Sequence, residues 1–255
     1  MQTGAITSYF DVAQLTIDGF WLFFAGLIVY LRREDKREGY PLVGDLPGDT
    51  THGWFPMTPE PKTYLFADGS TVTVPRSERE PTGGLKPTGP NSTYPQVPTG
   101  NPLVDAVGPA AYAQRHDVPD KDWEGHPRIV PLRAAKDFYI DPDEPDPRGY
   151  KVVALDRVVV GTVREAWIDR VEPQVTFLEV SLAAGGRTIL VPFRLATLSV
   201  PAKTVSVVSI NSAQFANVPG LKNPDVVTLL EEDKIAAYFS GGHLYATAER
   251  QEPVI

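Results

Sequence analysis

A short polar segment with two carboxylates is the part of this sequence whose residue types could carry chemistry. Asp169, Arg170 and Glu172 lie between two apolar runs, where a turn is expected. Neighbouring carboxylates can share and pass protons, because like charge raises the pKa of one of them. A solvated turn between two strands would have the same composition. The residues alone leave both interpretations open.

Motifs that would indicate an enzyme are missing from the sequence. There is no GxxxxGK[ST], no GxGxxG, no GxSxG and no HExxH. The chain has no cysteine, which excludes disulfides, thiolate metal sites and cysteine nucleophiles. Its four histidines include no i, i+4 pair, so their spacing does not predict a zinc site.

Two further acidic runs are explained without a ligand. Residues 141–146 resemble a calcium-binding loop only in charge, because they lack its glycine and its distal glutamate, and their alternating prolines favour a solvated turn. Residues 231–233, Glu-Glu-Asp, are explained equally well as a solvated helix face. We therefore take neither run as a candidate site.

Composition and charge narrow the possible function classes. Of the 255 residues, 42% are hydrophobic and 22% charged, which is typical of one or two globular domains. The 24 Lys and Arg against 32 Asp and Glu give a net charge of −8, so we expect no nucleic-acid partner. All 24 cations lie at or after Arg32, directly behind an apolar run.

That apolar run, residues 12–31, predicts a transmembrane helix. Its twenty residues, at about 1.5 Å each, span about 30 Å of hydrocarbon. A cleaved signal peptide would carry its cations before the apolar region, with a small-residue cleavage site after it. A buried core helix of a soluble protein would leave a polar face, whereas the aromatic residues within 20–24 point all round the helix. The membrane span explains the run better than either alternative.

The cations after the span predict its orientation. Lys and Arg beside a span remain in the cytoplasm, so residues 32–37, RREDKR, place the C-terminal part there and the N-terminus in the periplasm. At the other end of the span, one helix face carries Asp11, Gln14 and Asp18, which are spaced i, i+3 and i+7. Within a membrane span, a carboxylate is tolerated only near the interface or where it faces protein or water. We expect a helix packed beside other membrane proteins, while Asp11 and Gln14 could equally lie in the outer headgroup zone.

A proline-rich and glycine-rich segment follows the span. Residues 41–131 hold 16 of the 25 prolines and ten of the 21 glycines, which excludes long helices and central strands. Recurring aromatic residues argue against a disordered linker. We expect extended chain lying on a folded surface, such as that of another protein. Within it, residues 63–66 and 71–74 flank Asp68-Gly69 and predict a hairpin.

The remainder predicts a small β-domain followed by a helix. Short runs rich in β-branched residues recur about every ten residues with no long helix between them, which favours an antiparallel barrel or sandwich. Asn223 is predicted to cap a helix that ends near Phe239, before Gly241-Gly242. The six strand-like runs are residues 151–156, 157–163, 165–169, 175–182, 187–193 and 204–210, and turns are expected at Asp156-Arg157, Glu172-Pro173 and Gly185-Gly186.

These features divide the chain into four parts. We expect a periplasmic N-terminus in residues 1–11 and a transmembrane helix in residues 12–31. An extended cytoplasmic segment in residues 32–131 would then lead to a cytoplasmic β-barrel domain with a C-terminal helix in residues 132–255. The predicted fold class is a single membrane-spanning helix joined to a mainly-β domain.

Several segments, in order along the chain, resemble the H subunit of the purple-bacterial photosynthetic reaction centre. The first is FWLFFAGLIVYLRREDKREGY, residues 20–40, and the last is residues 215–242, which contain VTLLEEDK and lead into YFSGGHLYA. Shorter matches lie between them, at residues 99–102 (TGNP), 107–110 (VGPA) and 177–180 (FLEV). The resemblance implies a PRC-barrel, a small β-barrel, in the cytoplasmic part.

The resemblance also implies a function without enzymatic activity. In this family the H subunit binds no pigment and caps the cytoplasmic face of the L and M subunits in the bacterial inner, intracytoplasmic membrane. The L and M subunits hold bacteriochlorophyll, bacteriopheophytin, quinones and non-haem iron, and the complex can include a cytochrome subunit and light-harvesting antenna. The H subunit shields the secondary-quinone site and assists proton delivery to it. Membrane lipids are further expected partners.

The resemblance assigns candidate residues for proton transfer. The family's proton-route carboxylate matches Glu172, and the nearby aspartate matches Asp169. A second entry region in some members has an Asp followed by two His. Here Asp122 and His126 are retained, but Glu124 stands where the other His would be. This departure puts both a proton-entry role and a metal site there in doubt.

Two other function classes remain as alternatives. A membrane-tethered PRC-barrel adaptor for another partner would show the same span and β-domain. A membrane enzyme with an unrecognised site is the third interpretation. Co-purification with pigment, read as near-infrared absorbance, would distinguish the reaction-centre subunit from both.

Overall fold

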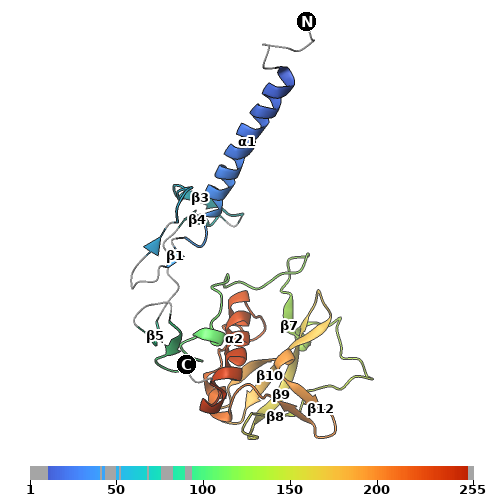
Figure 1. Cartoon of the computed structure of the whole chain (residues 1–255). Helices are drawn as coiled ribbons and strands as arrows, with labels where there is room; N and C mark the ends of the chain where they lie inside the picture. Colours follow the sequence, from blue (N-terminus) through green and yellow to red (C-terminus); the bar gives the residue numbers. More distant parts are fainter. Residues whose placement is uncertain are drawn as a thin grey trace. The chain divides into compact units, whose positions relative to one another are not determined.

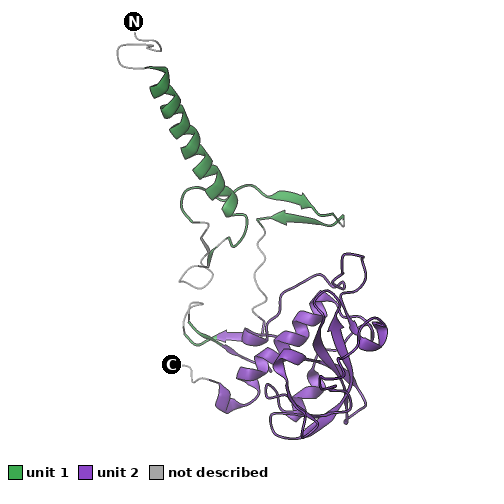
Figure 2. Ribbon diagram, turned by 90° about the vertical axis from the view of Figure 1, so that its right-hand side faces the viewer, with its two compact units in different colours: residues 1–82, 87–96 green, residues 83–86, 97–255 purple. Residues whose placement is uncertain are grey.

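The computed structural model describes residues 11–40, 42–43, 50–51, 53–67, 69–75, 83–89 and 94–251. The chain divides into two compact units (Figure 2). The first comprises residues 1–82 and 87–96 and contains a long helix and a hairpin. The second comprises residues 83–86 and 97–255 and contains a seven-stranded sheet with a helix packed on it (Figure 1).

The predicted apolar helix is present as α1, Val12–Asp35. Asp11 caps it, because the Asp11 side chain accepts a hydrogen bond from the amide of Gln14 at 2.7 Å. None of the α1 residues is buried, which rules against the core helix of a soluble domain. In length and hydropathy α1 suits a single membrane span.

The predicted hairpin is confirmed as β3, Lys62–Leu65, paired with β4, Thr71–Val74. Gly69 has a φ of +83°, a conformation that favours glycine in this turn. Asp68, the other predicted turn residue, lies outside the described residues. Two further pairs of short strands lie in the proline-rich segment: β1, Leu42–Val43, with β2, Thr50–Thr51, and β5, Leu85–Pro87, with β6, Gln96–Pro98.

The second unit is built on one mainly antiparallel sheet. Its strand order is β11-β10-β9-β8-β13-β12, with β7 also paired to β9. Only β13 and β8, among the pairs in this sheet, run parallel. The strands are β7, Ile129–Pro131; β8, Lys151–Val153; β9, Val159–Asp169; β10, Gln174–Leu182; β11, Thr188–Pro192; β12, Thr197–Ser199; and β13, Thr204–Ser206.

The sheet corrects several strand predictions. The runs 157–163 and 165–169 form the single strand β9, because Arg164 between them is an outward-facing strand residue rather than a turn. The run 204–210 is a strand only to Ser206. Strands β7 and β12 were not predicted, since three residues give no alternating pattern. The three predicted turns do connect strands, with a φ of +63° at Arg157 and +75° at Gly185.

Helix α2, Leu229–Tyr245, differs from its prediction at both ends. Thr228, not Asn223, is the N-cap, and its hydroxyl accepts from the amide of Glu231. The helix continues through Gly241 and Gly242, because these glycines allow close packing: a Cβ on Gly241 would lie 2.5 Å from that of Ala110. The inner face of α2 places Ile235 and Phe239, both fully buried, in the core of the second unit.

Candidate functional site

Asp169, a predicted site residue, is the last residue of β9 and is buried, with 3% of its surface exposed. It pairs with Ile129 of β7 on one side and Gln174 of β10 on the other. Arg128, just before β7, donates from Nε to both carboxylate oxygens at 2.9 and 2.8 Å, and its NH2 lies 2.6 Å from Oδ2. The amides of Val171 and Glu172 donate to Oδ1 at 2.8 and 3.1 Å.

These hydrogen bonds determine the charge of Asp169. Burial alone would raise the pKa of the carboxyl group, because it disfavours the ionised form. The hydrogen bonds from Arg128 and from the two amides outweigh burial and hold the pKa of Asp169 below its ordinary value. Asp169 is therefore a fixed negative charge at neutral pH, and the pKa of Arg128 is raised in turn.

Glu172, the second predicted carboxylate, lies on the rim of the same site. Its side chain is 66% exposed, and its Oε1 lies 3.5 Å from NH2 of Arg128. The Gln174 side chain donates to its other oxygen at 3.1 Å. Arg128 therefore connects a buried carboxylate to a solvent-facing one.

The other three predicted residues form a compact group in which Glu124 and His126 are exposed and Asp122 is half-buried. Asp122 accepts from the amides of Glu124 and His126 at 3.0 and 2.9 Å. His126 Nδ1 lies 3.5 Å from Glu124 and 3.8 Å from Asp122. Burial tends to raise the pKa of Asp122, but these amide hydrogen bonds outweigh it and lower the pKa. The ligand atoms of the three residues lie within 4.8 Å of one another.

One arginine joins the two predicted groups. Arg170 follows Asp169 in the chain, and its NH1 lies 3.4 Å from the Asp122 carboxylate. Its amide donates to the Arg128 carbonyl at 2.9 Å. The structure therefore brings all five predicted residues to one end of the β7–β9 pair, although they come from segments more than forty residues apart.

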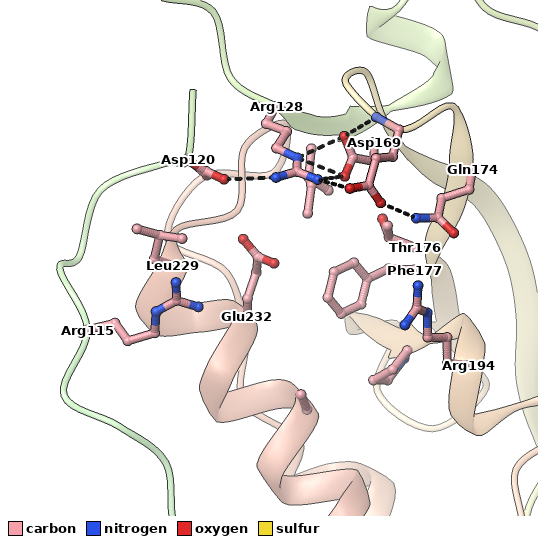
Figure 3. Close-up of a pocket in the computed structure, with 14 residues that line it drawn as sticks. Arg115, Asp120, Arg128, Asp169, Gln174, Thr176, Phe177, Arg194, Leu229 and Glu232 are labelled. Atoms are coloured by element: carbon pink, nitrogen blue, oxygen red, sulfur yellow. Dashed lines mark hydrogen bonds and ion pairs between the residues drawn. The ribbon is translucent and has the colours of Figure 1, made fainter. Parts of the chain in front are cut away.

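A cavity of about 380 Å³ opens beside Asp169 (Figure 3). The chain supplies its walls from four separate places: the loop before β7, the β9–β10 turn with the start of β10, the end of β11 with Arg194, and α2. Its charged lining residues are three arginines and four carboxylates, and apolar side chains such as Phe177 and Leu229 close the rest. The charged residues are Arg115, Asp120, Arg128, Asp169, Glu172, Arg194 and Glu232.

Glu232 is the functional candidate that sequence reasoning missed. Its carboxylate points from the first turn of α2 into the cavity (Figure 3). Burial raises its pKa to about 7, while Arg115 and Arg128 lower it and Asp120 and Asp169 raise it. Glu232 therefore changes its charge near neutral pH, whereas Asp169 beside the same cavity stays ionised.

The acidic run 231–233 is thus not a solvated helix face. Glu231 is buried in the capping box and also accepts from the amide of Lys222. Asp233 accepts from the amide of Ala113 at 3.1 Å. A signal was available, since Leu229, Glu232 and Ala236 follow at i, i+3 and i+7 and share the helix face that lines the cavity.

Comparison with protein families assigns most of the chain. Residues 4–134 match the model of the photosynthetic reaction centre H-chain N-terminal region, and residues 136–213 match the PRC-barrel domain. The chain belongs to the reaction-centre H-chain family. It is therefore a non-catalytic structural subunit, associated with other reaction-centre subunits, and the predicted PRC-barrel is confirmed.

The site draws on both matched regions of the H-chain and on a third. Arg128 and Asp122 lie in the N-terminal match, and Asp169 and Glu172 lie in the PRC-barrel match. Glu232 lies on α2, beyond both. The cavity exists only because all three are folded together in the second unit.

Proposed function

We propose that this H-chain caps the cytoplasmic face of the L and M subunits, shields their secondary-quinone site and delivers protons to it during light-driven electron transfer. The cavity beside Asp169 supports the proton-delivery role. Its carboxyl groups combine a fixed negative charge, Asp169, with a group of pKa about 7, Glu232. A proton relay needs such a contrast, because one charge must stabilise the proton that another group accepts and releases.

The proposed route enters from solvent at the exposed Glu124 and His126, which lie beside the half-buried Asp122, and at Glu172. Arg170 contacts Asp122 and Arg128 contacts Glu172. The arginines hold the carboxylates in place, while Glu172 and Glu232 exchange protons. The quinone itself would be held by neighbouring subunits, along with the pigments and the non-haem iron.

We also propose the topology on which this role depends. The cation excess after α1 supports a periplasmic segment 1–11, a span at 12–31 and a cytoplasmic remainder, with the segment 32–131 leading to the β-domain 132–255. The absence of native cysteine allows a clean test. A Val200→Cys variant in sealed inner-membrane vesicles of known sidedness should react with a membrane-impermeant maleimide only from the cytoplasmic side. Reaction from the periplasmic side alone would reverse the orientation.

The decisive experiment on proton delivery uses the assembled complex. Glu232→Gln, Glu172→Gln and their double variant keep the side-chain shape but remove the exchangeable proton. We expect unchanged pigment content and slower proton-coupled second reduction of the secondary quinone, with the largest effect in the double variant above pH 7. Flash-induced electron transfer and proton uptake measured across pH would show it.

Glu144 offers a matched control for these variants. It lies in the acidic run 141–146, is exposed and does not line the cavity. Glu144→Gln should therefore leave both rates unchanged. Unaltered rates in the Glu172→Gln/Glu232→Gln double variant would remove the cavity from the proton route and leave a capping role alone.

A further inference from the structure

The end of α1 carries a surface that neither the family assignment nor the proton route explains. Five large apolar side chains of the first unit are exposed beside it, and we call them the apolar collar. In the loop after the helix, Trp54 is 90% exposed and Met57 is 75% exposed. The collar consists of Trp54, Phe55 and Met57 on that loop and Leu65 and Phe66 at the tip of the β3–β4 hairpin.

Lys36, the residue after α1, holds the loop part of the collar. Its ammonium group donates to the carbonyls of Trp54 and Pro56 at 2.7 and 2.6 Å. Gly53 allows this approach, since it has a φ of +71° and a Cβ there would lie 3.2 Å from the Lys36 nitrogen. The side chains of Trp54 and Met57 are not used in these bonds, so they face outward.

Arg37 holds the hairpin part in the same way. It donates to the carbonyls of Glu60 and Val74 at 2.8 and 3.2 Å, at the base of the β3–β4 hairpin. Glu34 orients Arg37 through a hydrogen bond of 2.7 Å. The hairpin consequently extends sideways from the end of α1 (Figure 2).

These contacts fix the depth of the collar in a membrane. Lys36 lies five residues after Leu31, the last residue of the apolar run, which is about 7.5 Å along a helix. Headgroup regions extend roughly 5–8 Å beyond the hydrocarbon on each side. Lys36 and the backbone bound to it therefore lie at headgroup level, and a hairpin extending sideways from the helix lies along the membrane surface.

We propose that the apolar collar inserts into the phospholipid headgroup region around the cytoplasmic end of α1. Tryptophan and other aromatic residues prefer this depth, because their apolar surface enters the acyl boundary while their polar edges stay hydrated. Exposed apolar side chains of this size otherwise mark an interaction surface. The occupant is lipid, and the collar sets the depth and tilt of the span independently of proton delivery.

The test places a spin label on the collar in the full chain. Because the chain has no cysteine, Met57→Cys gives a single labelling site. The labelled chain is assembled with its partner subunits in vesicles of phosphatidylcholine and phosphatidylglycerol. Collisions with oxygen, which concentrates in lipid, are compared with collisions with a water-soluble nickel chelate by electron paramagnetic resonance. We expect oxygen accessibility to exceed nickel accessibility at this site.

Val200→Cys is the matched control, since Val200 is half-exposed in the second unit. There nickel should exceed oxygen. Adding Lys36→Met to Met57→Cys should shift the label toward water, because the loop loses the bonds that hold its depth. Nickel exceeding oxygen at Met57→Cys would overturn the proposal. Low accessibility to both reagents would also overturn it, because a partner subunit would then cover the collar.

Discussion

The two units of this chain differ in whether they bury a tryptophan in a core of their own. Trp21 and Trp54 of the first unit are 59% and 90% exposed, whereas Trp167 in the core of the second is fully buried; Trp123, on a loop of the second unit, is 91% exposed. A tryptophan in water is unfavourable, so the first unit depends on surroundings that the chain does not provide. The second unit surrounds Trp167 with a hydrophobic core of its own. The candidate membrane span and the proposed proton site thus lie in parts of the chain that are stabilised differently.

The cations beside the span and those of the candidate site also differ in the groups that they contact. Lys36 and Arg37 bind backbone carbonyls and fix the shape of the chain beside the span. Arg37 also pairs with the Glu34 carboxylate, whereas Arg128 and Arg170 of the second unit contact the carboxylates of the candidate site. A carbonyl has no titratable proton, whereas a carboxylate responds to pH. The second unit offers Glu232, whose pKa burial raises to about 7, so that its charge can change near neutral pH.

The largest expected effect tests the contrast between the tryptophans. Trp167→Ala should lower the free energy of unfolding of the second unit by about 3–5 kcal/mol, because it leaves a cavity and removes the indole hydrogen bond to Glu179. Trp21→Ala should leave that free energy unchanged. Urea unfolding in detergent, followed by circular dichroism of the β-domain, measures both. Equal destabilisation would mean that the two units unfold together.

The next effect concerns the buried pair of Arg128 and Asp169. Arg128→Met should destabilise the second unit by about 3 kcal/mol at pH 7, because it leaves a buried carboxylate with only amide donors. Adding Asp169→Asn should recover part of this loss. Since the pKa of Asp169 is lowered on folding, its stabilising effect is present above its unfolded pKa. That contribution is lost as the pH falls through the folded pKa. The free energies of unfolding of the parent chain and of Arg128→Met should therefore converge in acid.

Glu232 gives a smaller effect with the opposite sign. Its pKa rises on folding from 4.5 to about 7, so ionisation opposes folding and the penalty grows as the pH rises between these values. Glu232→Gln should therefore be more stable than the parent chain at pH 8, by about 1–2 kcal/mol after solvent screening, and similar to it at pH 4. Urea titrations at both pH values measure this. A pH-independent difference would show that burial does not control Glu232.

Residue patterns predicted much of the fold and less of the site. The span and the hairpin could be read locally, because each has its own periodicity and turn residues. The joining of Arg128 to Asp169 could not, because it depends on β7 pairing with β9 across forty residues. Glu232 was missed because a charged residue in an acidic run resembles a solvated surface until the opposite wall of its cavity is known.

The smallest expected effect sharpens where α2 begins, and so how Glu232 is aimed. Thr228 accepts from the Glu231 amide and donates to Asp117, whereas the Asn223 side chain accepts from the local amide of Asp225. Thr228→Ala should thus cost about 1 kcal/mol of stability, and Asn223→Ala clearly less. Loss of the cap should also fray the first turn, which carries Glu232, and move its pKa toward 4.5 because the carboxyl group gains water. Urea unfolding combined with infrared titration of the carboxyl groups measures both consequences. A larger loss in Asn223→Ala would place the functional start of the helix at Asn223, and the cavity would then need another explanation for the direction of Glu232.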